Sequence, residues 1–140
     1  MLIMLSSDTC RYILRQQPTD LLSALQSWSS QADELVISAI TYAELVAGAL
    51  LTAEQQRHVQ LVDEFCQRLD DIVPWDAGAV DAYTRIQLQA MENSRSLNMN
   101  DAMVAAHALS LDAMLLTLSK TSFTGIEGLN LQVWEQKEAR

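Results

Sequence analysis

Short apolar runs alternate along this chain with longer segments in which apolar residues recur at every third or fourth position. The short runs predict buried β-strands, and the longer segments predict amphipathic helices. The predicted strands span residues 2–5, 35–38, 72–75, 114–117 and 131–134, and the predicted helices span 9–15, 19–31, 41–50, 54–69, 76–91 and 100–111. Strands that alternate with helices predict an α/β sandwich with a largely parallel sheet. Pro74 indicates that the third strand lies at an edge of that sheet. Asp76 is expected to be the N-cap of the helix that follows.

The length and composition are those of one folded domain. A chain of 140 residues with 49% hydrophobic content can bury one core, so we expect a single domain over residues 1–140. No apolar run reaches the roughly 18 residues that a membrane helix needs, and the apolar start is read as a strand rather than a signal peptide. Cys10 and Cys66 are isolated from each other and from histidine motifs, which indicates reduced thiols in a cytoplasmic protein.

The net charge of −9 limits how the chain can meet nucleic acid. Tight binding through a broad basic surface is disfavoured, because such binding depends on neutralising phosphates. A nuclease remains compatible with this charge, since metal ions at the site supply positive charge locally. The charge also suits a chain that associates with a basic partner.

Three carboxylates follow predicted strands at the points where helices begin. Asp8, Glu44 and Asp101 are far apart in sequence, but the carboxyl ends of parallel strands lie on one edge of a sheet. Their side chains are therefore expected to converge on one acidic pocket. Clustered carboxylates repel one another unless a cation lies between them, and Mg²⁺ or Mn²⁺ is the usual cation. The pattern predicts metal-dependent phosphodiester chemistry.

Each acid also has a structural explanation. Asp8 is suited to cap the helix that it precedes, and Thr41 with Glu44 has the spacing of a capping box. Asn98 and Asp101 have a similar cap-like spacing. Caps alone do not require the same edge of the sheet, so the three positions together favour a shared site.

The remaining polar residues give weaker signals. His107 lies in an apolar, alanine-rich segment and is interpreted as a buried, hydrogen-bonded histidine rather than a ligand. Ser6, Ser7 and Ser119 are not accompanied by a histidine in a triad pattern, which argues against a serine hydrolase.

Two segments resemble the PIN domain family, in particular the VapC-type toxins of bacterial toxin–antitoxin pairs. They are Ile-Ser-Ala-Ile-Thr-Tyr-Ala-Glu-Leu at 37–45 with Gly48, and Asn-Asp at 100–101 followed by Ala-Ala-His-Ala at 105–108. The ending, with Thr117, Phe123, Gly128, Leu129 and Trp134, is also similar. The resemblance covers nearly the whole chain. It implies a PIN-like three-layer α/β/α sandwich with a mainly parallel central sheet.

The chain departs from the family pattern after the first strand, where such toxins usually have Leu-Asp-Thr-Asn. A gapless alignment places Ser6 at the first catalytic aspartate and Asp8 at the asparagine. The alternative alignment pairs Asp8 and Thr9 with Asp-Thr, but it needs a two-residue deletion before Tyr12. Ser119 occupies the position where the family has a polar or acidic residue after the threonine.

The resemblance implies an endoribonuclease toxin that cleaves RNA phosphodiester bonds and is neutralised by a cognate antitoxin. Asp8, Glu44 and Asp101 would be the catalytic residues and the ligands of Mg²⁺ or Mn²⁺, with Ser6 and Ser119 lining the site. The implied substrate is RNA, with tRNA among the candidates. Arg11, Arg15 and Lys120 are candidates for RNA contact, although solvation at the surface is the simpler account of each.

Further partners follow from the same resemblance. It implies a homodimer that occupies operator DNA only through its antitoxin. The absence of a long apolar run argues against membrane association. Because serine replaces acidic or polar positions at Ser6 and Ser119, activity could be weakened. The alternative is a catalytically degenerate PIN domain that serves as an antitoxin-binding and dimerisation module.

Overall fold

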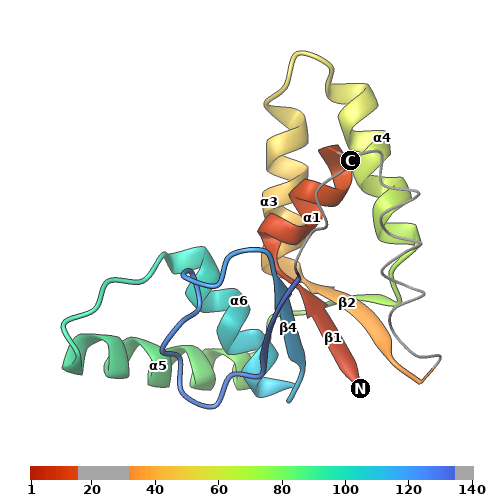
Figure 1. The fold of residues 1–140 in the computed structure, drawn as a ribbon. Coiled ribbons are helices and arrows are strands. Elements are labelled where there is room, and N and C mark those ends of the chain that lie inside the picture. Colours follow the sequence, from red (N-terminus) through yellow and green to blue (C-terminus); the bar gives the residue numbers. More distant parts are fainter. Residues whose placement is uncertain (16–31, 135–140) are drawn as a thin grey trace, which may run out of the picture.

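The computed structural model of the chain describes residues 1–15 and 32–134 (Figure 1). The strands are β1 Leu2–Leu5, β2 Glu34–Ser38, β3 Asp71–Val73, β4 Met114–Thr117 and β5 Leu131–Val133. The helices are α1 Ser7–Arg15, α3 Ala39–Leu50, α4 Gln55–Gln67, α5 Ala77–Glu92 and α6 Met99–Ser110. Every predicted element within the described residues is present to within two residues at each end. The helix predicted at 19–31 lies outside the described residues.

The described strands form one sheet in the order β3-β2-β1-β4-β5, and all four pairings are parallel. The predicted parallel sheet is therefore confirmed. Strand β3 lies at an edge and ends just before Pro74, as predicted from the proline, which cannot donate a ladder hydrogen bond.

Helices cover both faces of the sheet, so the structure has three layers. Ile3 and Leu5 point to a core shared with α1, α3 and α4, whereas Met4 points to a core shared with α5 and α6. This alternation follows from the two-residue period of a strand, which turns successive side chains to opposite faces. Figure 1 shows α3 and α4 rising as a hairpin on one side and α5 beside α6 on the other.

The strand order reverses direction between β1 and β4. The chain proceeds from β1 to β2 and β3 on one side, and then enters β4 on the other side of β1. Ligands of open α/β sheets bind beyond the carboxyl ends of strands at such a reversal. A hydrogen bond joins the ends of β1 and β4 there: the backbone N–H of Ser6 donates to the carbonyl oxygen of Leu116 at 2.9 Å.

The helix starts confirm two predicted caps and correct two others. Asp76 and Asn98 cap α5 and α6, each accepting a backbone N–H three residues later at 3.1 Å. The capping box predicted at Thr41 is wrong, because α3 begins earlier and Ser38 caps it. Asp8 is likewise not a cap, since it lies inside the first turn of α1. Helices α1 and α3 each begin two residues earlier, nearer the preceding strand, than the sequence pattern predicted.

Across residues 1–15 and 32–134, none of the helices combines the length and apolar character needed to cross a membrane.

Candidate functional site

The three acidic residues lie on helices that start at the carboxyl end of the sheet. Asp8 is in the first turn of α1, Asp101 is in the first turn of α6, and Glu44 is in the first half of α3. Asp8 and Glu44 follow β1 and β2 as predicted, but the same prediction is wrong for Asp101, because α6 comes directly after α5. Burial raises the pKa of the Asp101 carboxyl, and the negative charges of Glu44 and Asp8 raise it further, while Arg11 lowers it. The three carboxylates therefore share one electrostatic field, although they come from three separate helices.

The Asp8 carboxylate is surrounded by donors at the junction of β1 and β4. The Thr117 hydroxyl lies 3.2 Å from Oδ1 and 3.1 Å from Oδ2, and the backbone N–H of Thr9 donates to Oδ1 at 2.7 Å. The buried Ser6 hydroxyl also donates to Asp8. The two alignments therefore put the first acidic position in the same part of the site, because Ser6 and Asp8 are in direct contact.

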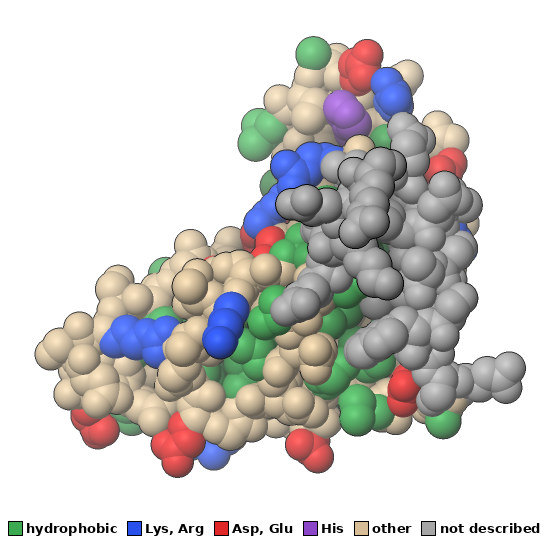
Figure 2. Space-filling model, in the orientation of Figure 1, with side chains coloured by type: hydrophobic (Ala, Val, Ile, Leu, Met, Phe, Trp, Pro, Cys, Tyr) green, Lys and Arg blue, Asp and Glu red, His purple; other side chains and the backbone are tan. Residues whose placement is uncertain are grey.

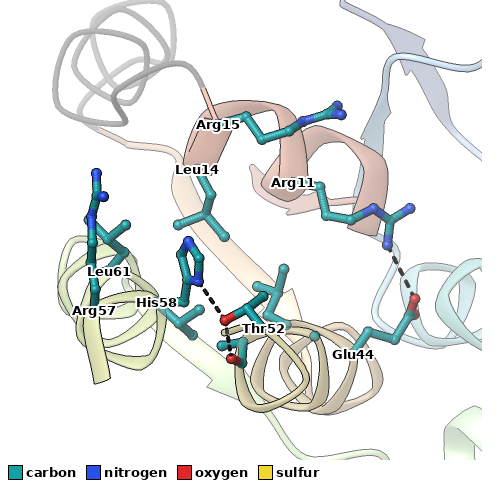
Figure 3. Close-up of a pocket in the computed structure, with 12 residues that line it drawn as sticks. Arg11, Leu14, Arg15, Glu44, Thr52, Arg57, His58 and Leu61 are labelled. Atoms are coloured by element: carbon teal, nitrogen blue, oxygen red, sulfur yellow. Dashed lines mark hydrogen bonds and ion pairs between the residues drawn. The ribbon is translucent and has the colours of Figure 1, made fainter. Parts of the chain in front are cut away.

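Glu44 is held by two partners from α1. The Ser7 hydroxyl donates to Oε1 at 3.0 Å, and Nη1 of Arg11 lies 3.4 Å from Oε2. The Ser7 hydroxyl also lies 3.2 Å from the hydroxyl of Thr41, one turn before Glu44 on α3. These contacts orient the glutamate toward α1 and place one cation beside it. Figure 3 shows the contact between Arg11 and Glu44.

The donor set was compared with what a divalent metal requires. Carboxylate and hydroxyl oxygens are the ligands that Mg²⁺ and Mn²⁺ prefer. Within the described residues, no three His, Cys, Asp or Glu side chains are gathered closely enough to hold a metal together. Mg²⁺ usually keeps several waters and binds through one or two carboxylates together with substrate phosphates, so a preassembled cluster of three is not required. The oxygen atoms of Asp8, Glu44 and Asp101 are therefore suitable ligands for Mg²⁺ or Mn²⁺.

The other predicted residues are distributed unevenly around this site. The backbone N–H of Ser119 donates to the Thr117 hydroxyl at 3.0 Å, which places Ser119 beside the Asp8 cluster. Arg11 reaches Glu44, Arg15 lies at the end of α1, and Lys120 is exposed on the loop after β4.

Sequence reasoning missed two hydroxyl residues that hold the acids, Ser7 on Glu44 and Thr117 on Asp8. Thr117 ends an apolar strand run at this edge, and Ser7 follows another such run after one intervening residue. A position at the carboxyl end of a strand could have identified both hydroxyls, but the sequence prediction used that criterion only for acidic residues.

A groove of about 520 Å³ runs from Glu44 along α1, α3 and α4. Its apolar lining includes Leu14, Leu45, Leu61 and Val62, and its basic lining includes Arg11, Arg15, Arg57 and His58. Figure 2 shows Lys and Arg side chains along α1, in front of α3, and a further one near the tip of the α3–α4 hairpin. A Cβ at Gly48 would meet nothing within 4 Å, so this glycine keeps the groove wall open.

His58 has a defined orientation in the groove (Figure 3). Its Nδ1 lies 2.6 Å from the hydroxyl of Thr52, which itself donates to the carbonyl oxygen of Ala49 at 2.8 Å. Because that hydroxyl hydrogen is already used, Nδ1 of His58 is the donor in the pair.

Comparisons with known proteins identify the family. The PIN domain profile matches residues 12–122, which is most of the chain, and the protein therefore belongs to the PIN domain family.

Within that family it is homologous to VapC toxin ribonucleases. Ribonuclease VapC1 of Haemophilus influenzae strain R2866 is 28% identical over 96% of this chain and 98% of its own. The tRNA(fMet)-specific endonuclease VapC of Shigella flexneri is 24% identical over 94% of this chain and 96% of its own. The crystal structure of VapBC2 from Rickettsia felis, bound to a DNA fragment from its promoter, superposes with a TM-score of 0.89 at 25% identity. It covers 96% of this chain and 100% of that chain. The likeness extends over the full length of the relatives, which establishes the PIN-like fold.

Proposed function

We propose that this protein is a metal-dependent endoribonuclease toxin that cleaves RNA and is silenced by a cognate antitoxin. The observation that carries the proposal is the placement of three carboxylates, Asp8, Glu44 and Asp101, on helices that start at the carboxyl edge of the sheet, where their negative charges interact. Like charges held together at the carboxyl edge of a sheet are costly to the fold, and a divalent cation relieves that cost. The full-length homology to VapC ribonucleases supports RNA as the substrate class.

Asp8, Glu44 and Asp101 are the proposed metal-binding and catalytic residues. Bound Mg²⁺ or Mn²⁺ would supply the positive charge that activates water and stabilises the phosphate transition state. Glu44 would be kept in place by the Ser7 hydroxyl, and Asp8 by the Thr117 hydroxyl. These hydrogen bonds fix where the two carboxylates lie before a metal binds.

Arg11 and Arg15 are proposed to contact the RNA backbone. Both lie on α1, four residues apart and thus one turn apart on one side of the helix. Arg11 is half exposed beside Glu44, so it can reach a phosphate next to the scissile bond. Guanidinium groups match the planar geometry of phosphate oxygens. tRNA is a candidate substrate because one homologue is a tRNA(fMet)-specific endonuclease.

The test is cleavage of a pool of structured RNAs, tRNA included, with Mn²⁺ or Mg²⁺ and with a chelator. Asp101→Asn should abolish metal-dependent cleavage. The matched control is Asp112→Asn, which removes the same charge from an exposed position just beyond the other end of α6. The control also keeps the local backbone, because Asp112 has φ 52° and asparagine tolerates that region. Equal cleavage by Asp101→Asn and the parent protein would refute the mechanism.

The groove along α1, α3 and α4 is the proposed antitoxin site. Apolar side chains of an amphipathic segment would pack on Leu14 and Leu61, and its acidic groups would meet Arg15 and Arg57. Because the groove ends at Glu44, the same segment can place a basic side chain at the acidic site. Leu61→Glu should weaken antitoxin binding measured by calorimetry without preventing RNA cleavage. Unchanged antitoxin affinity would place the antitoxin elsewhere.

Homodimerisation is also proposed, and an apolar stripe on α5 supports it. Val80, Leu88 and Met91 are 45%, 55% and 73% exposed and recur at helical spacing on one side of the helix. Leu88→Lys should convert a dimer to a monomer in size-exclusion chromatography with light scattering. A parent protein that is monomeric at micromolar concentration would refute this part.

Operator DNA would be bound only through the antitoxin, since a net charge of −9 disfavours direct contact with DNA. A cytoplasmic location is proposed because both cysteines are free thiols.

A second candidate function is a catalytically degenerate PIN domain that binds an antitoxin and dimerises. Two features favour it: Ser6 occupies the aspartate position in the gapless alignment, and the hydroxyls of Ser6 and Thr117 already bond the carboxylate of Asp8. Mn²⁺ titration separates the two functions. Micromolar Mn²⁺ binding that is lost in Asp101→Asn supports the nuclease. No detectable Mn²⁺ binding by a folded protein that still binds its antitoxin supports the degenerate module.

A further inference from the structure

His107 is a fully buried histidine that links two helices of the candidate site. It lies on α6 and is 0% exposed, and its Nδ1 is 2.8 Å from the hydroxyl oxygen of Ser38. Ser38 is the last residue of β2 and the N-cap of α3, and it too is 0% exposed. The predicted buried, hydrogen-bonded histidine is thus confirmed, and its partner is the residue from which α3 begins.

The hydrogen bonds around Ser38 determine the tautomer of the imidazole. The Ser38 hydroxyl oxygen accepts the backbone N–H of Ile40 at 3.1 Å, as an N-cap does. Its own hydrogen needs an acceptor in a site without water access, and Nδ1 of His107 lies in that position. This arrangement favours Nδ1 as the acceptor, with the ring proton on Nε2.

Nε2 of His107 is buried and lacks a hydrogen-bond partner within the described part of the chain. Burial lowers the pKa of His107, and the Asp76 carboxylate and the Pro74 backbone oppose this shift without outweighing it. An unpaired buried polar atom costs stability. A leucine of similar volume would avoid that cost. We therefore expect the imidazole to provide an interaction that leucine cannot provide, namely the hydrogen bond to Ser38.

The contact between His107 and Ser38 is the same number of residues away from each of two proposed metal-binding residues. Asp101 precedes His107 by six residues on α6, and Glu44 follows Ser38 by six residues on α3. Six residues of helix correspond to about 9 Å. A shift at the His107–Ser38 contact would therefore change the separation of the two carboxylates, because helices move as rigid elements.

We propose that His107 is a positioning residue, a neutral strut that fixes α6 against the start of α3 and thereby sets the spacing of Asp101 and Glu44. The role of the strut in metal binding rests on the proposed function, whereas the strut itself does not. Protonation of Nδ1 would reverse the bond to Ser38 and leave the serine hydrogen without an acceptor. The hydrogen bond from Ser38 to Nδ1 therefore requires the neutral form of the His107 imidazole.

The strut is tested first without metal, by nitrogen-15 NMR of the imidazole in the full chain. The expected result is an unprotonated Nδ1 and a protonated Nε2 at pH 7. Thermodynamic coupling should also appear in unfolding, with the His107→Leu and Ser38→Ala losses less than additive. A protonated Nδ1, or strictly additive losses, would overturn the strut.

Its effect on the site is tested by Mn²⁺ affinity, measured by calorimetry on folded variants. His107→Leu and Ser38→Ala should each weaken Mn²⁺ binding by roughly tenfold, as loss of supporting contacts does. His107→Asn should retain affinity, because its Oδ1 can accept the Ser38 hydrogen. The matched control is Val104→Ala, which loses buried volume from α6 outside this contact and should bind Mn²⁺ like the parent protein.

The outcomes separate this inference from the proposed function. Mn²⁺ binding by the parent that is unaffected in both His107→Leu and Ser38→Ala overturns the positioning role and leaves the nuclease proposal intact. Weakening in Val104→Ala as large as in His107→Leu also overturns the role, since general loss of packing would then explain the effect. A parent protein that binds no Mn²⁺ overturns the nuclease proposal, and the NMR and unfolding results then decide the strut alone.

Discussion

Replacing Thr117 by valine tests whether the hydroxyl cluster holds Asp8 in place. Valine keeps the shape of the buried side chain but removes the hydroxyl that lies 3.2 Å and 3.1 Å from the two carboxylate oxygens. A hydrogen bond to a charged group contributes about 1.5–3 kcal/mol. Asp8 is only half-buried, so we expect the lower part of that range, about 1.5–2 kcal/mol. For a domain of this size, that corresponds to a melting temperature lower by roughly 3–8 °C.

The assay is urea denaturation of the full chain, with Thr84→Val as the matched control. The Thr84 hydroxyl donates to the carbonyl of Val80 at 3.0 Å on the exposed side of α5, so its loss should change stability by less than about 0.5 kcal/mol. Asp8→Ala should remove most of the Thr117→Val effect in the double variant. The reasoning is refuted if Thr117→Val costs no more than Thr84→Val, or if its cost is undiminished in the Asp8→Ala background.

Three further predictions concern charge and thiols at the site. Asp101→Asn should raise the melting temperature at pH 7, and the gain should shrink between pH 7 and pH 4. A carboxyl whose folded-state pKa is raised contributes stability that is lost as pH rises through that pKa; equal gains at both pH values would contradict this. Arg11→Gln should raise the pKa of Asp101 further in carboxyl NMR titration, because it removes the cation beside Glu44; a lower pKa would contradict this arrangement. Burial raises the pKa of Cys10 and raises that of Cys66 to about 11, so a disulfide reagent at pH 8 should modify both slowly until urea unfolds the chain. Rapid modification of the native protein would show that burial does not suppress the thiolates.

The sequence by itself determined the elements and their arrangement. Apolar runs such as 2–5 and 114–117 have the length and composition of buried strands, and their alternation with helices leaves a parallel sheet as the main solution. Pro74 placed the third strand at an edge because proline lacks an N–H, and Asp76 marked a helix start because its side chain satisfies a free backbone N–H. These features depend on local chemistry, which the sequence contains in full.

Only the tertiary structure decided which side chains meet at the site. The hydroxyls of Ser7 and Thr117 hold Glu44 and Asp8 across separations of 37 and 109 residues. The capping box predicted at Thr41 was wrong because Ser38, at the end of a strand, begins the helix earlier. His107 was predicted to be buried, but its tautomer depends on a serine 69 residues away. Hydrogen bonds of this kind are selected by sheet order and helix packing, and spacing along the chain carries no record of them.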